Sequence, residues 1–329
     1  MPLPRLLVMS LGGTITMTPN ASGGGIAPTM SAADLVGAIP GLAKIAEIDA
    51  RSPLMLPSPS LTLEHIAAVA TEIRAAFAAG FEGAVVIQGT DTIEETTFAL
   101  DLLVRGDKPI VVTGAMRGPL APGAEGPANI LAACVVAASQ AARGLGTLAV
   151  LNDEIHAARF VRKARTALPS AFVSANAGPL GLVAEGRARF FTRVMRPELP
   201  ELSGVGALPA VALLKLAMGD DGRLIRALPT LGFAGAVLEG MGAGHVPADI
   251  ADSVVGVAGQ MPIVLATRTL AGPVFERTYG YPGSEIDLLA RGLIPAGLLQ
   301  GPKARLLLTL GLASGWDRAT LASAFAAYG

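Results

Sequence analysis

The sequence predicts a two-domain α/β protein, with a larger N-terminal domain built on a parallel sheet and a smaller C-terminal α/β domain. Short, continuous apolar runs alternate with segments in which apolar residues recur at helical spacing. Strands of a parallel sheet that is covered by helices on both faces produce such runs. The chain has 329 residues and is 51% hydrophobic, which is too long for one compact unit and sufficient for a large core.

In the N-terminal domain the apolar runs and the helical patterns follow each other in order. The expected strands are residues 5–10, 83–87, 109–113 and 147–151. The expected helices are one that Ser31 caps at its N-terminus, followed by residues 62–79, 93–104 and 125–143. Residues 128–151 form the most apolar stretch, but polar residues and glycines interrupt the ~20 apolar residues that a membrane span needs. They are therefore interpreted as a buried helix followed by a strand.

A change of composition marks the expected domain boundary. From about residue 190 to 206 the chain becomes rich in Pro and Gly and loses its regular pattern. We expect an N-terminal domain over 1–190, a linker over 191–208 and a C-terminal domain over 209–329. In the last of these, strands are expected at 211–216, 234–238 and 262–266, and helices at 248–257 and 302–312.

Composition argues against several classes of function. Charged residues make up 16% of the chain and the net charge is −1, whereas proteins that bind nucleic acid through phosphates usually carry a basic excess. The single cysteine, Cys134, cannot form an intramolecular disulfide or a multi-cysteine metal site. The N-terminus lacks the features of a secretory signal. We expect a cytoplasmic protein that binds no metal, cofactor, nucleic acid or membrane.

Polar residues gather in the loops that follow the predicted strands. Ligands of open parallel sheets bind beyond the carboxyl ends of the strands, so these loops are candidates for a site. They are residues 11–16, 88–95, 114–117, and 152–154 together with 159–166. Four loops that carry Thr, Asp, Arg and Lys are expected to converge on one edge of one sheet.

Each of these features also has a purely structural interpretation. Gly12 and Gly13 could form an ordinary tight turn. Thr90 and Asp91 could cap the next helix, with Glu94 or Glu95 completing a capping box. Lys163 could belong to a solvated face with the arginines on either side of it.

The usual hydrolase and nucleotide-binding motifs are missing from the sequence. There are three histidines, none beside a G-x-S-x-G motif, and His65 is expected to be structural. No H-E-x-x-H metal motif, dinucleotide-binding motif or phosphate-binding loop motif is found.

Seven segments together point to one family. They are LGGTI (11–15), GTDTIEET (89–96), KPIVVTGAMR (108–117), EGPANI (125–130), NDEIHAAR (152–159), LEGMGAGHVP (238–247) and PKARLLL (302–308). In these segments, which cover both domains in order, the chain resembles the bacterial-type L-asparaginases, including the related glutaminase-asparaginases. The resemblance implies hydrolysis of L-asparagine, with L-glutamine as an alternative substrate, by a homotetramer built from intimate dimers that share active sites.

The resemblance also implies roles for individual residues. Thr14 matches the nucleophilic threonine, whose attack would release ammonia and leave a β-acyl ester that water hydrolyses to aspartate. Thr90, Asp91 and Lys163 match a second catalytic group, and Asp91 also matches the residue that binds the α-amino group of the substrate. Ser58, with Ser60 as a competing choice, matches the serine that holds the α-carboxylate, and Ala115 matches the residue whose backbone carbonyl faces the substrate amide. Glu285 matches a glutamate that the neighbouring subunit supplies. Backbone N–H groups of the loop at Gly13 could stabilise the oxyanion.

The sequence departs from the family pattern at three positions. The family usually has a tyrosine on the loop after the nucleophile, where this chain has Gly25 or Ile26. We hypothesise that Tyr279 or Tyr281 takes over that role, although both could instead pack a subunit interface. His245 stands where relatives often have Asn near the substrate amine, and Gln88 stands where they commonly have His.

Two other functions share this resemblance. An amidase subunit for tRNA-dependent amidation has the same fold, but it would need an additional N-terminal domain and a tRNA-bearing partner. A non-catalytic sensor of asparagine or aspartate would fit the missing tyrosine, but the four residues Thr14, Thr90, Asp91 and Lys163 argue for catalysis.

Overall fold

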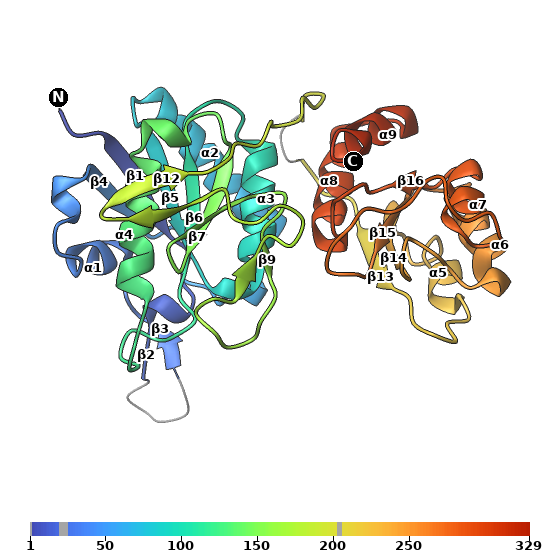
Figure 1. Ribbon diagram of the computed structural model, residues 1–329, viewed down its shortest axis with the longest axis horizontal. Coiled ribbons are helices and arrows are strands. Elements are labelled where there is room, and N and C mark those ends of the chain that lie inside the picture. The colour runs from blue at the N-terminus through green and yellow to red at the C-terminus, as the bar shows by residue number, and fades with distance from the viewer. Residues whose placement is uncertain (1, 20–25, 203–205) are drawn as a thin grey trace. The chain divides into compact units, whose positions relative to one another are not determined.

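The computed structural model describes residues 2–19, 26–202 and 206–329, which form two compact units (Figure 1). The boundary between the units lies between Arg196 and Pro197, inside the Pro- and Gly-rich segment that the sequence singles out. Each unit has its own sheet and its own core, so each is described by itself.

The first unit is built on an eight-stranded sheet with the strand order β12-β11-β8-β7-β6-β5-β1-β4. Strands β7, β6, β5, β1 and β4 are parallel, and the others extend the sheet in antiparallel orientation. The strands are β1 Arg5–Ser10, β4 Glu47–Arg51, β5 Gly83–Ile87, β6 Ile110–Thr113, β7 Thr147–Leu151, β8 Glu154–Ala157, β11 Gly181–Ala184 and β12 Arg187–Phe190. The four strands expected in this unit are confirmed.

Residues 152–154 are not the open site loop that we expected. Asn152 and Asp153 have φ values of 51° and 61° and form a tight turn that leads directly into β8. Two successive residues with positive φ suit the type I′ turn that joins twisted antiparallel strands. The expected all-parallel sheet is therefore extended by an antiparallel hairpin.

Helices cover both faces of this sheet, with α1 and α4 on one side and α2 and α3 on the other (Figure 1). The helices are α1 Ala32–Gly37, α2 Leu63–Ala78, α3 Ile93–Leu103 and α4 Gly126–Ala137. Short elements complete the unit: β2 Met17–Pro19, β3 Ile26–Pro28, β9 Arg162–Lys163, β10 Phe172–Val173, and the 3₁₀ turns η1 Thr14–Thr16, η2 Leu42–Lys44, η3 Ser58–Ser60, η4 Thr90–Thr92 and η5 Gln140–Ala142.

The helix ends follow from their capping residues. Ser31 caps α1, as expected, and Thr62 caps α2 together with the imidazole of His65, which confirms the structural role expected for that histidine. The expectation that the fourth helix continues to residue 143 is wrong. It ends at Ala137, because the Ser139 hydroxyl accepts the Ala141 N–H and starts a separate turn.

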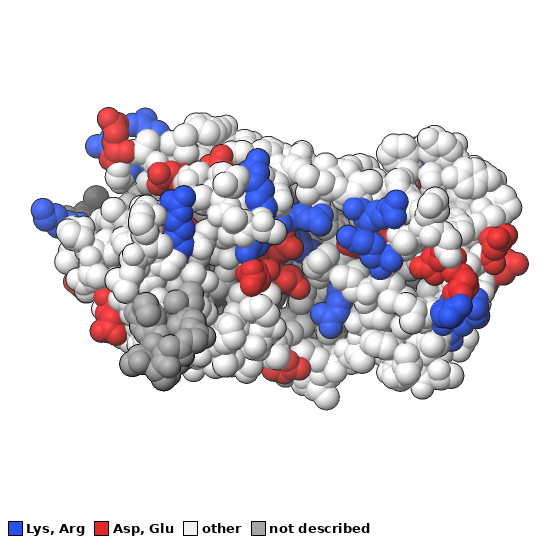
Figure 2. Space-filling view, turned by 90° about the horizontal axis from the view of Figure 1, so that it is seen from below, with Lys and Arg blue, Asp and Glu red and all other residues white. Residues whose placement is uncertain are grey.

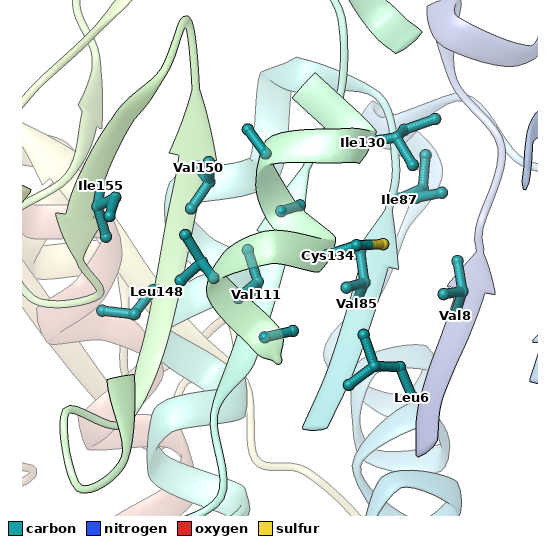
Figure 3. Close-up of a cluster of buried hydrophobic side chains, with 14 of the residues drawn as sticks. Leu6, Val8, Val85, Ile87, Val111, Ile130, Cys134, Leu148, Val150 and Ile155 are labelled. Atoms are coloured by element: carbon teal, nitrogen blue, oxygen red, sulfur yellow. The ribbon is translucent and has the colours of Figure 1, made fainter. Parts of the chain in front are cut away.

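Helix α4 packs its apolar side chains against the centre of the sheet (Figure 3). Ile130 and Cys134 face a layer of fully buried β-branched and leucine side chains on the neighbouring strands. That layer contains Leu6, Val8, Val85, Ile87, Val111, Leu148 and Val150. The stretch that is most apolar in the sequence is thus a core helix and strand.

The second unit is a smaller α/β sandwich around a four-stranded parallel sheet of order β13-β14-β15-β16. Its elements are β13 Val211–Lys215, α5 Arg223–Ala227, β14 Gly235–Gly240, α6 Ala248–Ala258, β15 Ile263–Thr267, α7 Glu285–Ala290, β16 Ile294–Pro295, α8 Gly301–Ala313 and α9 Arg318–Ala326. Helices α5, α6 and α7 share one core with the sheet, and α8 packs on three of its strands. The predicted fold class is confirmed.

The surface of the molecule carries charges of both signs. Acidic and basic side chains are interspersed on the face that Figure 2 shows. Among the described residues, no helix has both the length and the apolar content that crossing a bilayer would require.

We expect Cys134 to be unreactive in the folded protein. Burial raises the pKa of its thiol to about 12, and the thiolate is the form that attacks thiol reagents. Ellman's reagent should therefore label the native protein very slowly at mildly alkaline pH, and rapidly in guanidinium chloride. Fast labelling of the native protein would show that α4 does not pack as described.

Candidate active site

The first unit contains a cavity of about 200 Å³ at the carboxyl ends of its parallel strands. Strand β1 lies between β5 and β4. The chain therefore passes from β1 to its neighbour β4 on one side, and then to β5 on the other side of β1. Ligands of such sheets bind at this reversal of direction. The cavity is lined by Gly13, Thr14, Met17, Pro57, Ser58, Pro59, Gly89, Thr90, Asp91, Met116, Lys163 and Thr166.

The loop after β1 is held against the loop after β5 by its backbone. The N–H of Leu11 donates to the carbonyl of Ile87 over 2.8 Å. Gly13 has a φ of 94°, and a Cβ at this position would overlap the backbone of Gly89. Only glycine tolerates both conditions, so Gly12-Gly13 is more than an ordinary turn. The turn η1 begins directly afterwards, which fixes the backbone of Thr14 at the cavity wall.

Three of the predicted residues form a connected polar group. The ammonium Nζ of Lys163 donates to Thr90 Oγ1 over 2.8 Å and to Asp91 Oδ1 over 2.5 Å. Neither Gly89 nor Thr92, the residues that precede η4 and α3, makes a side-chain cap. The interpretation of Thr90 and Asp91 as helix caps is therefore wrong, because their side chains are directed to the lysine.

The position of Lys163 is fixed through its backbone as well as its side chain. Its N–H donates to Glu94 Oε2 over 2.9 Å, and β9 pairs with β10. Only 17% of its side chain is exposed, while 58% of the Asp91 side chain is. Lys163 is thus not part of a solvated basic face. Glu94 holds it in place, a role that the sequence did not suggest beyond a possible capping box.

Ser58 is the serine that lines the cavity, whereas Ser60 is not among the lining residues. The buried Ser58 hydroxyl accepts the Asp91 N–H over 3.2 Å, and its carbonyl accepts the hydroxyl proton of Thr92. The side chain amide of Gln88 donates to that same Thr92 hydroxyl over 3.1 Å. Of the two serines, Ser58 is the one that lines the cavity, and the α-carboxylate role expected for it stays a prediction.

The loop after β6 lines the cavity through Met116, while the side chain of Ala115 is buried behind it. Helix α4 and the residue before it hold this loop: Glu125 Oε1 accepts the N–H of Met116, and Asn129 Nδ2 donates to the Gly114 carbonyl over 2.8 Å. The EGPANI segment thus supports the site, although sequence reasoning assigned no role to its individual residues. The other lining residues that it missed are Met17, Pro57, Pro59, Gly89, Met116 and Thr166.

The remaining predicted site residues lie in the second unit. His245, Tyr279, Tyr281 and Glu285 form a cluster there, near the start of α7. Of the two positions considered for the missing tyrosine, Ile26 begins β3, and Gly25 lies outside the described residues.

Comparisons with known proteins agree over both units. The family model Asparaginase, N-terminal matches residues 5–196, and the model Glutaminase/Asparaginase C-terminal domain matches residues 210–325. The chain is 35% identical to the probable L-asparaginase of Deinococcus radiodurans, over 98% of this chain and 97% of that one. It is 33% identical to the L-asparaginase of Bacillus licheniformis, over 94% and 96% of the two chains.

A similar structure has been solved. It is the probable cytoplasmic L-asparaginase from Campylobacter jejuni, with a TM-score of 0.87 and 29% sequence identity. The match covers 98% of this chain and 99% of the other.

We expect Gly13→Ala to destabilise the first unit more than an alanine at a comparable but open glycine. Gly80 is the matched control, because its φ of 90° is similar and no atom lies within 4 Å of an added Cβ. Gly80→Ala should lower the free energy of unfolding by about 1 kcal/mol. Gly13→Ala should lower it by about 3 kcal/mol or more, because its methyl group meets backbone. Urea unfolding measures both, and equal losses would contradict the close contact of the two loops.

Proposed function

Because the chain belongs to the asparaginase family, we propose that it hydrolyses the side-chain amide of L-asparagine to give L-aspartate and ammonia. The observation that carries this proposal is the group formed by Lys163, Thr90 and Asp91 at the wall of the cavity that Thr14 also lines. A cavity of about 200 Å³ is smaller than the ~300–1,000 Å³ of drug-sized ligand pockets, which fits a small amino acid.

The charges of the cavity suit the two ends of a free amino acid. The carboxylate of Asp91 is well exposed and would bind the α-amino group. Ser58 would hold the α-carboxylate by its hydroxyl, and the buried position of that hydroxyl fixes where it donates. With both ends bound, the amide carbon would be held near Thr14, and longer substrates would be excluded.

The reaction would proceed by covalent catalysis. The Thr14 hydroxyl attacks the amide carbon and gives up its proton, while backbone N–H groups of the loop at Gly13 and the fixed loop at Ala115 and Met116 orient the carbonyl and the leaving amide. Ammonia leaves with a proton supplied by the site, and a β-acyl ester on Thr14 remains. Lys163 and Thr90 would move protons as water hydrolyses that ester.

We also propose that the enzyme works in the cytoplasm as a homo-oligomer, a dimer or a tetramer. The name of the Campylobacter jejuni structure and the single, buried Cys134 support a reducing compartment. Glu285 and its neighbours in the second unit would complete the site of a neighbouring copy. Activity on L-glutamine is a broader alternative, and binding of asparagine without turnover would indicate a sensor.

Thr14→Ala should abolish turnover while asparagine or aspartate still binds. The variant lacks the nucleophile, so ammonia release should fall by about a thousandfold or more. Release is measured on L-asparagine and on L-glutamine, and ligand binding by calorimetry. Thr71→Ala, which removes a hydroxyl from the exposed side of α2, is the control and should turn over normally. Full activity of Thr14→Ala would exclude the threonine mechanism.

Lys163→Met should lower kcat by about a hundredfold or more, because a group that moves protons is lost. The matched control is Arg162→Met, since neighbouring side chains of a strand point to opposite sides. It removes an equal charge one residue away and should leave kcat near the wild-type value. Equal losses in both variants would indicate that only the basic charge of this region matters.

A further inference from the structure

The second unit contains a chain of hydrogen bonds that joins a carboxylate, an imidazole and a phenol. Glu285 Oε2 lies 3.1 Å from His245 Nε2, and His245 Nδ1 lies 2.9 Å from the Tyr281 hydroxyl oxygen. Glu285 is fully buried at the start of α7, whereas 48% of Tyr281 is exposed. This series of hydrogen bonds therefore runs from the interior of the unit to its surface.

The charge of Glu285 fixes the direction of these hydrogen bonds. Burial by itself raises the pKa of Glu285, but the N–H groups of Tyr279 and Thr278 and the imidazole of His245 more than offset it, so the pKa is lowered overall. An ionised carboxylate only accepts, so His245 Nε2 carries the proton. Nδ1 of the neutral ring is then an acceptor, and the Tyr281 hydroxyl donates to it.

The segment around Tyr281 is held in place by hydrogen bonds between its backbone and the side chains of Glu285 and Ser284. The N–H groups of Thr278 and Tyr279 donate to Glu285 Oε1 over 2.9 and 2.7 Å. The Ser284 hydroxyl donates to the Tyr279 carbonyl over 2.6 Å. A phenol on such a fixed segment is preorganised for a reacting partner, as active-site groups must be.

The two tyrosines contact His245 in different ways. The ring of Tyr279 meets the imidazole edge-on, with 4.9 Å between ring centres. Tyr281 reaches the imidazole nitrogen with its hydroxyl. Burial and the nearby Glu285 charge raise the pKa of the Tyr281 phenol, which keeps its proton available to the imidazole. Of the two candidates, the geometry therefore favours Tyr281 as the group that exchanges protons.

We propose that Tyr281, His245 and Glu285 form a proton relay that one copy of the chain supplies to the Thr14 of another copy. This inference rests on the proposed amide hydrolysis. As the Thr14 oxygen bonds to the amide carbon, its proton passes to the Tyr281 oxygen, and the Tyr281 proton passes to His245 Nδ1. The imidazolium is stabilised by Glu285. The same path in reverse returns the proton to the departing nitrogen, which leaves as ammonia, so no external acid or base is needed.

Within this relay Tyr281 is the catalytic residue, while His245 and Glu285 act through it. Tyr281→Phe should lower kcat for asparagine by about a hundredfold with little change in KM, because general acid–base groups contribute at least that factor. Tyr279→Phe likewise removes a phenol hydroxyl from this segment. Its kcat should stay at least ten times higher than the kcat of Tyr281→Phe. An equal or larger effect of Tyr279→Phe would overturn the assignment.

The pH profile separates proton transfer from a structural role. The titratable groups in contact with His245 are Glu285, Tyr279 and Tyr281. The relay passes a proton to the imidazole, which must be free to accept it, so wild-type kcat should fall on the acidic side. That acidic limb should disappear from the residual activity of Tyr281→Phe and of His245→Asn. An unchanged limb in both variants would sink the relay.

Complementation tests whether the relay acts between copies. Thr14→Ala and Tyr281→Phe chains, each nearly inactive alone, are co-expressed and purified together. In a symmetric dimer whose sites combine both copies, half of the dimers would be mixed, each with one intact site. About a quarter of wild-type activity should return. Absence of rescue in a mixed oligomer would refute action between copies, whereas an inactive wild type would instead refute the proposed function.

Discussion

The close approach of two glycine-bearing loops is the constraint on which the site depends. Gly13 and Gly89 follow neighbouring strands, and their backbones come so near that a side chain on Gly13 would overlap Gly89. This contact sets the spacing between Thr14 and Thr90, which are the residues that come directly after each glycine. The two hydroxyls therefore line one cavity because the backbones pack closely at the centre of the sheet. Burial leaves the chain the least freedom to move there.

The second requirement is that a distant lysine reaches this centre. Lys163 lies 72 residues from Asp91 along the chain, and the hairpin of β7 and β8 brings the intervening chain back to the cavity. The ammonium is mostly buried while the Asp91 carboxylate is 58% exposed, so solvent still screens part of their interaction. Glu94, one helical turn past Asp91, holds the lysine backbone, so the same segment binds the lysine at both ends.

The sequence could predict the strands with continuous apolar runs and the residues at their carboxyl ends. A strand that is buried on both faces is apolar at every position, which is easily recognised in a sequence. It could not predict β4, whose side chains are only partly buried and therefore include charged residues. The turn at Asn152 and Asp153 could have been found, since such residues favour positive φ. The clamps made by Glu125 and Asn129 depend on tertiary contacts that no local pattern encodes.

The buried Glu285 is difficult to explain as a device for stability. Removing an ionised carboxylate from water costs several kcal/mol, and apolar residues of similar volume often stabilise a protein as well or better. Here the charge is retained and satisfied by backbone N–H groups on one oxygen, which leaves the other oxygen directed to His245. A carboxylate that served only the backbone of its segment would need neither the imidazole nor the exposed phenol beyond it. The arrangement instead has the order that proton transfer requires, with a fixed charge inside, a titratable ring between, and a donor at the surface.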